Sequence, residues 1–250
     1  MAIVVIGGHS RNVGKTSVVA GLISALREFE WTAVKITQYG HGICSADGQA
    51  CDCATDDHAW AISEERNRSG ESDTSRFLVA GASRALWVRT EQGRLAEAMP
   101  ALRAKIEGAG NVIVESNSVM KFLRPDLYLT VLDPATVDFK NSAREFLDRA
   151  DAVILHQTFG TETAWQAVSL KPVAERPVFR ITPPMYVTTE IVEFVRSNSQ
   201  KKRCAKSDTY ILPSKSRCAA NSGAKIKTST RNDDPKKLSD PEIQFRKRFL

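Results

Sequence analysis

The N-terminal segment holds the pattern that most restricts how this chain can fold. A short apolar run, Ala2–Ile6, leads directly into a glycine-containing loop and then into a helical pattern from about Lys15 to Glu28. The stretch reads VVIGGHSRNVGKTSVVAGL. A buried strand, a glycine-containing loop and a helix that opens at Gly-Lys-Thr together predict an α/β fold in which the loop binds phosphate.

The spacing of this loop departs from the usual pattern, in which four residues separate the first glycine from Gly-Lys-Ser/Thr. Counting back from Gly14 places His9 where that glycine belongs, and glycines stand at Gly7 and Gly8 instead. A loop that is one residue longer would begin at Gly8. A tight strand-to-helix turn with an incidental lysine is the alternative interpretation.

Each part of the predicted loop has a chemical role. Backbone N–H groups around Asn12–Thr16 would converge on an anion at the positive end of the helix dipole. The Lys15 ammonium would bridge the terminal phosphates, and the Thr16 hydroxyl would bind Mg²⁺. The predicted nucleotide-binding residues are Gly8, His9, Ser10, Arg11, Asn12, Val13, Gly14, Lys15, Thr16 and Ser17.

The chain to about residue 181 alternates apolar runs with helical patterns. Helices are predicted at His58–Arg66, Thr74–Ala80 and Gln92–Ile106. With Ala2–Ile6, the apolar runs give about seven strands: Trp31–Thr37, Ala85–Arg89, Val112–Glu115, Leu127–Leu132, Ala152–His156 and Val178–Ile181. This order predicts a three-layer sandwich, a mainly parallel sheet covered by helices on both faces. Ligands of such sheets bind at the carboxyl ends of the strands.

Two charged residues belong to strands that lead to this edge. Glu115 ends a buried run and is placed to hold Mg²⁺ together with Thr16, or to orient a nucleophile; a solvated strand-end glutamate is the alternative. Lys35 interrupts an apolar strand, which is costly unless its ammonium reaches a partner or the strand is an edge strand that faces solvent. Lys15, Glu115 and Lys35 are the candidate catalytic residues.

The net charge of +6 is concentrated near the C-terminus. Residues from Ser197 onward carry 14 of the 35 Lys and Arg residues and 5 of the 29 Asp and Glu residues, which leaves 21 basic and 24 acidic residues before that point. We therefore predict a nucleotide-binding domain over residues 1–196 and a basic, disordered tail over residues 197–250. A solvated tail of this kind does not indicate nucleic-acid binding.

The hydropathy of the chain bears on its cellular location. No apolar run approaches the roughly 20 residues that a membrane-spanning helix needs. Met1-Ala2-Ile3 leads into the first predicted strand without the basic segment of a secretory signal. We expect a cytoplasmic protein that does not bind membranes.

A cysteine-rich insertion over residues 38–58 follows the second predicted strand. It contains His41, Cys44, Cys51 and Cys53. Thiolates and an imidazole can supply four ligands for tetrahedral Zn²⁺, or thiolates for an iron–sulfur centre. A loop with free thiols is the alternative.

Several motifs together resemble known families. GGHSRNVGKTS resembles the extended phosphate loop of dethiobiotin synthetases, in which five residues separate the first glycine from Gly-Lys-Thr, so that Gly8 pairs with Gly14. ESDTSRFLVAGASRALWVRT and NVIVESNS resemble segments of the molybdopterin-guanine dinucleotide biosynthesis adapter proteins (MobB). Both families belong to the SIMIBI class of P-loop NTPases, and the similarity covers roughly residues 2–160.

The resemblance implies a P-loop NTPase fold that binds ATP or GTP with Mg²⁺, a homodimer, and a Lys35 that faces phosphate or an acidic substrate. The base is left open. Related GTP-binding proteins carry Asn-Lys-x-Asp after the strand that contacts the base, whereas His156 and Gln157 stand there in this chain. A hydrogen-bonded strand-end histidine is the simpler interpretation of His156.

Three functions remain open at this stage. A MobB-like protein would hydrolyse GTP and assist a partner enzyme in molybdenum cofactor maturation. A dethiobiotin synthetase-like ligase or kinase would use ATP to activate a small carboxylate or carbamate held between Lys15 and Lys35. A nucleotide- and metal-dependent switch or metallochaperone would use the cysteine-rich insertion.

Overall fold

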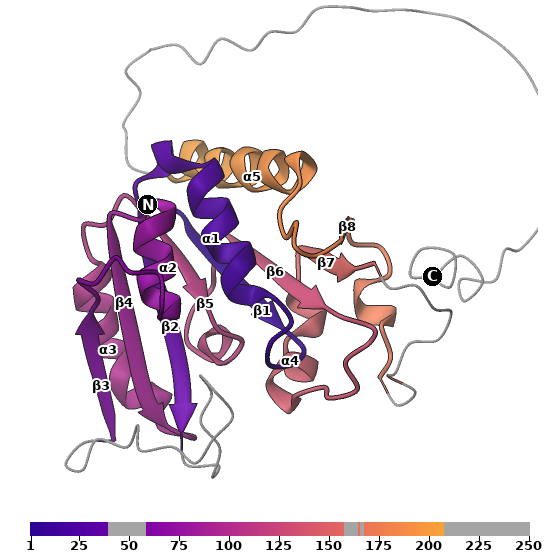
Figure 1. The fold of residues 1–250 in the computed structure, drawn as a ribbon, viewed down its shortest axis with the longest axis horizontal. Helices are drawn as coiled ribbons and strands as arrows, with labels where there is room; N and C mark the ends of the chain where they lie inside the picture. The colour runs from indigo at the N-terminus through magenta and orange to yellow at the C-terminus, as the bar shows by residue number, and fades with distance from the viewer. Residues whose placement is uncertain (40–58, 158–164, 166–167, 208–250) are drawn as a thin grey trace, which may run out of the picture.

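A computed structural model describes residues 1–39, 59–157, 165 and 168–207 of the chain (Figure 1). Within these residues, eight strands form one sheet in the order β3-β4-β2-β5-β1-β6-β7-β8. The strands are β1 (Ile3–Gly8), β2 (Trp31–Tyr39), β3 (Trp60–Glu64), β4 (Arg84–Glu91), β5 (Asn111–Glu115), β6 (Leu127–Leu132), β7 (Ala152–His156) and β8 (Val178–Ile181). Every neighbouring pair is parallel except β3 and β4. The predicted mainly parallel sheet is confirmed.

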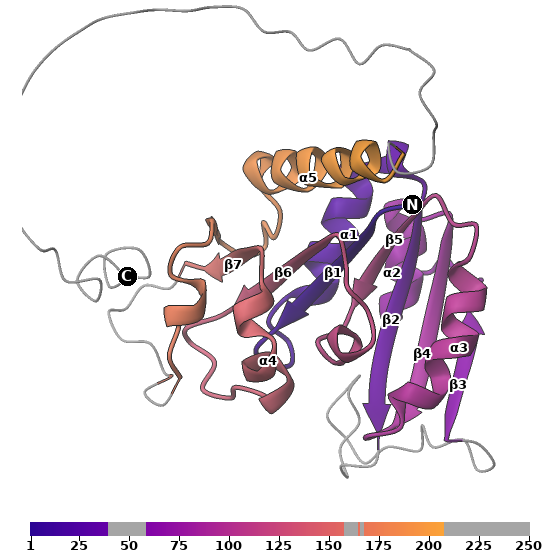
Figure 2. The same ribbon diagram turned by 180° about the vertical axis from the view of Figure 1, so that it is seen from behind.

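Helices cover both faces of this sheet, as Figures 1 and 2 show from opposite sides. The α-helices are α1 (Lys15–Ala25), α2 (Asp73–Ala80), α3 (Leu95–Ile106), α4 (Asn141–Glu145) and α5 (Thr189–Ser207), and the 3-10 helices are η1 (Arg27–Phe29), η2 (Ser118–Lys121), η3 (Leu147–Arg149) and η4 (Lys171–Val173). Buried side chains of α1, α2 and α5 form one apolar cluster with the sheet, and those of α3 and α4 belong to a second. The predicted three-layer sandwich is confirmed.

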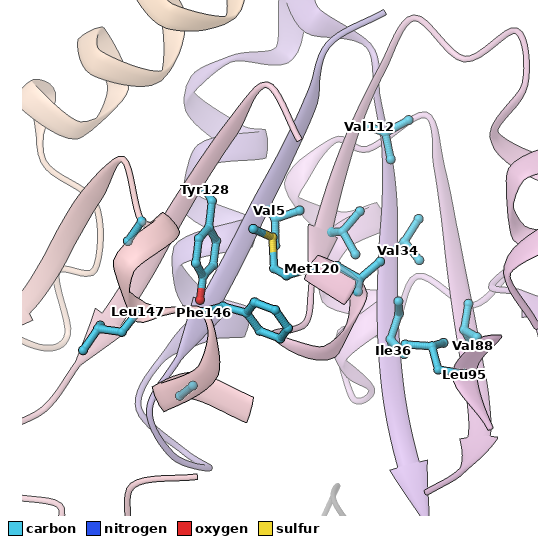
Figure 3. Close-up of a cluster of buried hydrophobic side chains, with 14 of the residues drawn as sticks. Val5, Val34, Ile36, Val88, Leu95, Val112, Met120, Tyr128, Phe146 and Leu147 are labelled. Carbon is cyan, nitrogen blue, oxygen red and sulfur yellow. The ribbon is translucent and has the colours of Figure 1, made fainter. Parts of the chain in front are cut away.

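The alternation of side chains along β1 shows why its whole run is apolar. Val4 and Ile6 belong to the cluster under α1, whereas Val5 belongs to the cluster on the opposite face, which also includes Val34 and Tyr128 (Figure 3). Successive side chains of a strand point to opposite faces, so a strand covered on both faces is apolar throughout.

The prediction of a helix over His58–Arg66 was wrong. This segment contains strand β3, which pairs antiparallel with β4. Trp60 and Ile62 pack against the α3-side cluster, while Glu64 is exposed. The outer edge of β4 supplies a hydrogen-bonding partner that local helix propensity does not take into account, and tertiary pairing decides the outcome.

The C-terminal boundary remains a prediction. Helix α5 crosses the expected division between residues 196 and 197 and continues to Ser207, and residues 208–250 of the predicted tail lie outside the described residues. In the part of the chain that the structure describes, none of the helices has both the length and the apolar character of a membrane span.

The strand order places a ligand crevice at one end of β1. Strand β1 lies between β5 and β6, although the chain passes through β2, β3 and β4 before it reaches either of them. At such a switch point, the connections leave in opposite directions and open a crevice at the carboxyl ends of the strands. The register also brings Lys35 of β2 and Ile6 of β1 level with Glu115 of β5.

Candidate functional site

The loop between β1 and α1 has an unusual backbone. Asn12 has a φ of 55° and Gly14 a φ of 85°, so two residues adopt the left-handed conformation. Gly14 is the N-cap residue of α1, and no side chain caps the helix. The first helical hydrogen bond runs from the Val18 amide to the Gly14 carbonyl, at 2.9 Å. The amides of Lys15 and Thr16 therefore point out of the helix end, which suits an anion.

The two glycines at the start of the loop serve different contacts. A Cβ at Gly7 would lie 2.2 Å from Oδ1 of Asn117, a distance that no packing tolerates. A Cβ at Gly8 would lie 2.9 Å from Val13 Cγ2 and 3.0 Å from Lys15 Cδ. Gly8 therefore leaves the space through which the Lys15 side chain passes under the loop. This contact agrees with a loop that begins at Gly8.

The Lys15 ammonium lies inside the curve of this loop. It donates a hydrogen bond to the Ser10 carbonyl at 2.5 Å. Burial lowers the pKa of Lys15, and Lys35 lowers it further, while Glu115 opposes the change. A partly desolvated ammonium held by one backbone carbonyl can readily exchange that partner for a phosphate oxygen.

Most of the predicted residues line one cavity of about 620 Å³. Those in its wall are Gly8, Arg11, Asn12, Gly14, Lys15, Thr16, Ser17, Lys35 and Glu115. The cavity lies at the carboxyl ends of the strands, and the lining continues to Gln38 and Gln92 on one side and to Tyr186 on the other. The structure thus brings the loop, the candidate lysines and the candidate glutamate to one place.

Three residues of the loop, His9, Ser10 and Val13, lie outside the lining. The buried His9 ring accepts a hydrogen bond from the Asp133 amide at Nε2, 3.0 Å, and its Nδ1 lies 2.7 Å from the Asp138 carbonyl. The neutral ring with its proton on Nδ1 satisfies both contacts, and burial lowers the pKa of His9. His9 and Ser10 therefore attach the loop to the segment after β6.

Val13 attaches the loop to the other end of the site. Its carbonyl accepts a hydrogen bond from Nε2 of the buried His156 at 3.0 Å. The prediction that His156 is a hydrogen-bonded histidine at a strand end is confirmed. The His156 ring also contacts the ring of Tyr186 edge-on, with 5.9 Å between the centroids.

Four side chains form a compact group at the end of β5. The Thr16 hydroxyl donates to Glu115 Oε2 at 2.8 Å, and the Lys35 ammonium forms an ion pair with Glu115. Lys35 Nζ also lies 2.8 Å from Asp73 Oδ2 and 3.3 Å from Thr16 Oγ1. Burial lowers the pKa of Lys35, but Glu115 and Asp73 outweigh burial and raise it. The alternative of a solvent-facing lysine on an edge strand is wrong, because β2 lies between β4 and β5.

This group fits a small divalent cation. The Thr16 hydroxyl and the carboxylates of Asp73 and Glu115 all lie within contact distance of the Lys35 ammonium, so three oxygen ligands gather at one point. Mg²⁺ prefers oxygen ligands and binds one or two carboxylates together with substrate phosphates. The described residues contain no group of three or more His, Cys, Asp or Glu side chains that could hold a metal ion.

The cavity wall also contains residues that were not among the predicted site residues, and five of them contact or approach the loop and its charged groups: Asp73, Arg76, Asn117, Lys140 and Tyr186. Asp73 and Arg76 belong to the motif ESDTSR and Asn117 to VESNS, so the sequence contained a signal for these three positions. Arg76 joins this end of the site by donating to the Ser17 hydroxyl at 3.1 Å. Lys140 and Tyr186 follow no local pattern.

Asn117 supports the loop from below. Its side-chain amide accepts from the Gly8 amide at 2.9 Å and donates to the Gly8 carbonyl at 2.8 Å. Tyr186 covers the opposite end of the loop, since a Cβ at Gly14 would lie 2.3 Å from its Cε1 atom. The residues predicted to bind zinc or an iron–sulfur centre, His41, Cys44, Cys51 and Cys53, lie outside the described residues.

Comparisons with known proteins do not assign a family. No protein-family model and no curated protein matches the chain. Among solved structures, HypB from Helicobacter pylori in complex with nickel matches with 13% identity and a TM-score of 0.42, over 86% of this chain and 91% of that one. LpxK from Aquifex aeolicus in complex with ATP matches with 16% identity and a TM-score of 0.40, over 84% and 68%.

A third structure shows a similar degree of likeness. The signal recognition particle 54 kDa protein from Aeropyrum pernix K1, in complex with GDP, matches with 15% identity and a TM-score of 0.39. The match covers 83% of this chain and 50% of that chain. At these identities and scores, none of the three carries its function over to this chain.

Proposed function

We propose that this chain binds a nucleoside triphosphate with Mg²⁺ in the cavity and hydrolyses it or transfers its terminal phosphate. The observation that carries this proposal is the convergence on one cavity of an uncapped helix end, the Lys15 ammonium and the Thr16–Glu115 hydrogen bond. Each of the three favours anions or a cation that accompanies them. Together they match the requirements of phosphoryl transfer, which depend on positioning and charge stabilisation.

Within this proposal, different residues of the cavity bind the phosphates and Mg²⁺. The amides at the start of α1 and Lys15 bind the phosphates, and Thr16, Glu115 and Asp73 hold Mg²⁺, which neutralises phosphate charge when bound. Glu115 is buried, with 3% of its surface exposed, so its carboxylate keeps a fixed orientation toward Thr16. Arg76 fixes Ser17 at the helix end.

Calorimetric titration of the full chain with the Mg²⁺ complex of a β,γ-imido nucleotide tests the proposal. The wild-type chain should bind one equivalent of either the adenine or the guanine analogue. Lys15→Ala should reduce the affinity at least 100-fold, while its circular dichroism spectrum should match that of the wild type and show that the fold is intact. Lys121→Ala is a matched control, because Lys121 is an exposed lysine paired with Glu145 on another surface. Unchanged affinity in Lys15→Ala would show that the loop does not bind phosphate.

We further infer that Tyr186 marks the nucleoside end of the site. Its ring lines the cavity and packs against Gly14, at the end of the loop from which a nucleoside would extend. Tyr186→Ala should weaken the binding of both ADP and GDP about tenfold, since stacking of a base on an aromatic ring contributes about 1–3 kcal/mol. Tyr186→Phe should bind normally. Inorganic triphosphate has no base, so an equal loss with that probe would contradict this assignment.

Transfer to a small acceptor is favoured by the extent of the cavity. Its wall continues beyond the loop to uncharged polar residues of several elements, Gln38, Gln92, Ser118, Asn141 and Ser142. A dethiobiotin synthetase-like ligase or kinase would place its acceptor there, and its turnover would require a small acid. A MobB-like adapter would show slow hydrolysis with a preference for GTP and would act with a partner enzyme. Hydrolysis assays with and without candidate acids separate the two.

A further inference from the structure

Lys140 brings a further positive group to the cavity from outside the loop. It lies between β6 and α4, and its backbone amide donates to the His9 carbonyl at 2.8 Å. Its side chain lines the cavity and is partly buried. The His9 contact fixes the Lys140 backbone next to the beginning of the phosphate loop.

The ammonium of Lys140 differs from the other lysines of the cavity, because it has no hydrogen-bond or ion-pair partner among the described residues. In the described part of the chain, it forms neither a hydrogen bond nor an ion pair, whereas Lys15 has the Ser10 carbonyl and Lys35 has two carboxylates. Asp138 is the nearest acidic residue of the same segment, and its carboxylate instead accepts from the Ser10 hydroxyl at 2.6 Å. Among the described residues, the charge of Lys140 is therefore not balanced by a direct partner.

Leaving this charge unpaired is costly in the unliganded protein. Burial lowers the pKa of Lys140 to about 8, and Lys15, Arg11 and Lys35 lower it as well, while Asp138 opposes them. A buried charge that lacks a partner is unfavourable, and neighbouring like charges add to the cost. An anion placed among these cations would offset the cost of the unpaired charge and the repulsion between the cations.

The position of Lys140 points to one end of the bound nucleotide. Tyr186 packs at Gly14, the last residue before α1, whereas Lys140 lies beside His9 at the first residues of the loop. The Lys15 ammonium, which bridges terminal phosphates in loops of this kind, is the charged group that most affects Lys140. Lys140 can therefore contact an anion that binds near Lys15, on the side of the cavity away from Tyr186.

We propose that Lys140 binds an oxyanion at the terminal-phosphate end of the cavity, opposite Lys15. This inference rests on the proposed nucleotide-binding function and extends it to a second wall of the site. The oxyanion has two sources, the γ-phosphate of the triphosphate or a small anionic acceptor next to it. Asn141 and Ser142, which also line the cavity, add polar groups beside the ammonium.

The test compares wild type, Lys140→Met and Lys140→Arg by calorimetry with three probes: the Mg²⁺ complex of β,γ-imido-ATP, MgADP, and inorganic phosphate added to the MgADP complex. If the γ-phosphate is the ligand, Lys140→Met weakens β,γ-imido-ATP binding on the order of tenfold, as expected for a hydrogen bond to a charged group, and leaves MgADP unchanged. If an acceptor is the ligand, only phosphate binding to the MgADP complex is lost. Lys140→Arg keeps the charge and should retain affinity.

The dependence on pH gives an independent readout. Burial and the neighbouring cations lower the pKa of Lys140 to about 8. The wild-type chain should therefore bind the anionic probe more tightly than Lys140→Met at pH 7, and this difference in affinity should shrink by pH 9. Lys140→Arg should still bind the anionic probe more tightly than Lys140→Met at pH 9, because the guanidinium keeps its proton. The inference is overturned if Lys140→Met binds all three probes as wild type does. A wild-type chain that binds no probe, or Lys15→Ala binding normally, would instead remove the proposed function itself.

Discussion

Lys35 and Lys140 lie in the wall of the same cavity and differ in their surroundings. Lys35 is enclosed by Glu115 and Asp73, which raise its pKa against the effect of burial. Lys140 is surrounded mainly by cations and has a pKa lowered to about 8. One end of the site is therefore balanced before any ligand binds, whereas the other end is balanced only by a ligand. Removing a charged group should accordingly change the free energy of unfolding in opposite directions at the two ends.

Removing a partner from the balanced end should have the largest effect. Glu115→Gln leaves the Lys35 ammonium with Asp73 alone and should lower the free energy of unfolding by about 3 kcal/mol, because breaking a buried ion pair leaves an uncompensated charge. Urea denaturation without ligand measures this. The double variant Lys35→Met with Glu115→Gln should recover part of the loss. A single variant as stable as wild type would contradict the pairing.

Removing the charge from the other end should stabilise the unliganded protein. Lys140→Met should raise the free energy of unfolding at pH 7 by about 1 kcal/mol, a modest figure because solvent screens a partly exposed group. The folded-state pKa of about 8 lies below the ordinary lysine pKa, so the unfolded chain binds the proton more tightly. The wild-type cost is therefore present below pH 8 and disappears between about pH 8 and pH 10.5.

The difference between wild type and Lys140→Met isolates this titration, because Lys15 and Lys35 are present in both chains. Unfolding curves at pH 7, 9 and 10 should show the gap closing as the pH rises. A gap that widens with pH, or a Met variant that is less stable at pH 7, would show that the Lys140 charge has a structural partner.

Removing one partner of an exposed ion pair should have the smallest effect on the free energy of unfolding. Arg94 pairs with Glu97 and Glu91 at distances as short as 2.7 Å, but all three side chains are nearly half exposed. Arg94→Ala should leave the free energy of unfolding nearly unchanged, since solvent screens exposed pairs. Urea denaturation in low and high salt checks this. A loss as large as that of Glu115→Gln would mean that burial does not distinguish the two kinds of pair.

The sequence predicted those parts of the site that depend on local order. Gly8, Lys15 and Thr16 belong to one strand–loop–helix unit, so their spacing alone indicates their arrangement. Glu115 was predictable because carboxyl ends of parallel strands meet at one edge of a sheet. Lys35 was left open because its environment depends on which strands flank β2, and the sequence does not state the strand order.

The remaining features depend on contacts between distant segments. Lys140 and Tyr186 reach the loop from positions more than 120 residues away in the chain, and neither belongs to a spacing pattern. His9 belongs to the loop by sequence, but its ring is held by backbone groups of the segment after β6. Strand β3 was missed because the free edge of β4, rather than local propensity, decides its conformation.

A crystal structure of the full chain with Mg²⁺ and β,γ-imido-ATP would show whether the nucleotide binds in this cavity. The phosphates should lie at the start of α1 between Lys15 and Lys140, with Mg²⁺ about 2.1 Å from Thr16 Oγ1 and from a carboxylate oxygen of Glu115. The base should lie on the Tyr186 side of the cavity. A triphosphate bound elsewhere, or bound in this cavity with its base beside Lys140, would contradict the account.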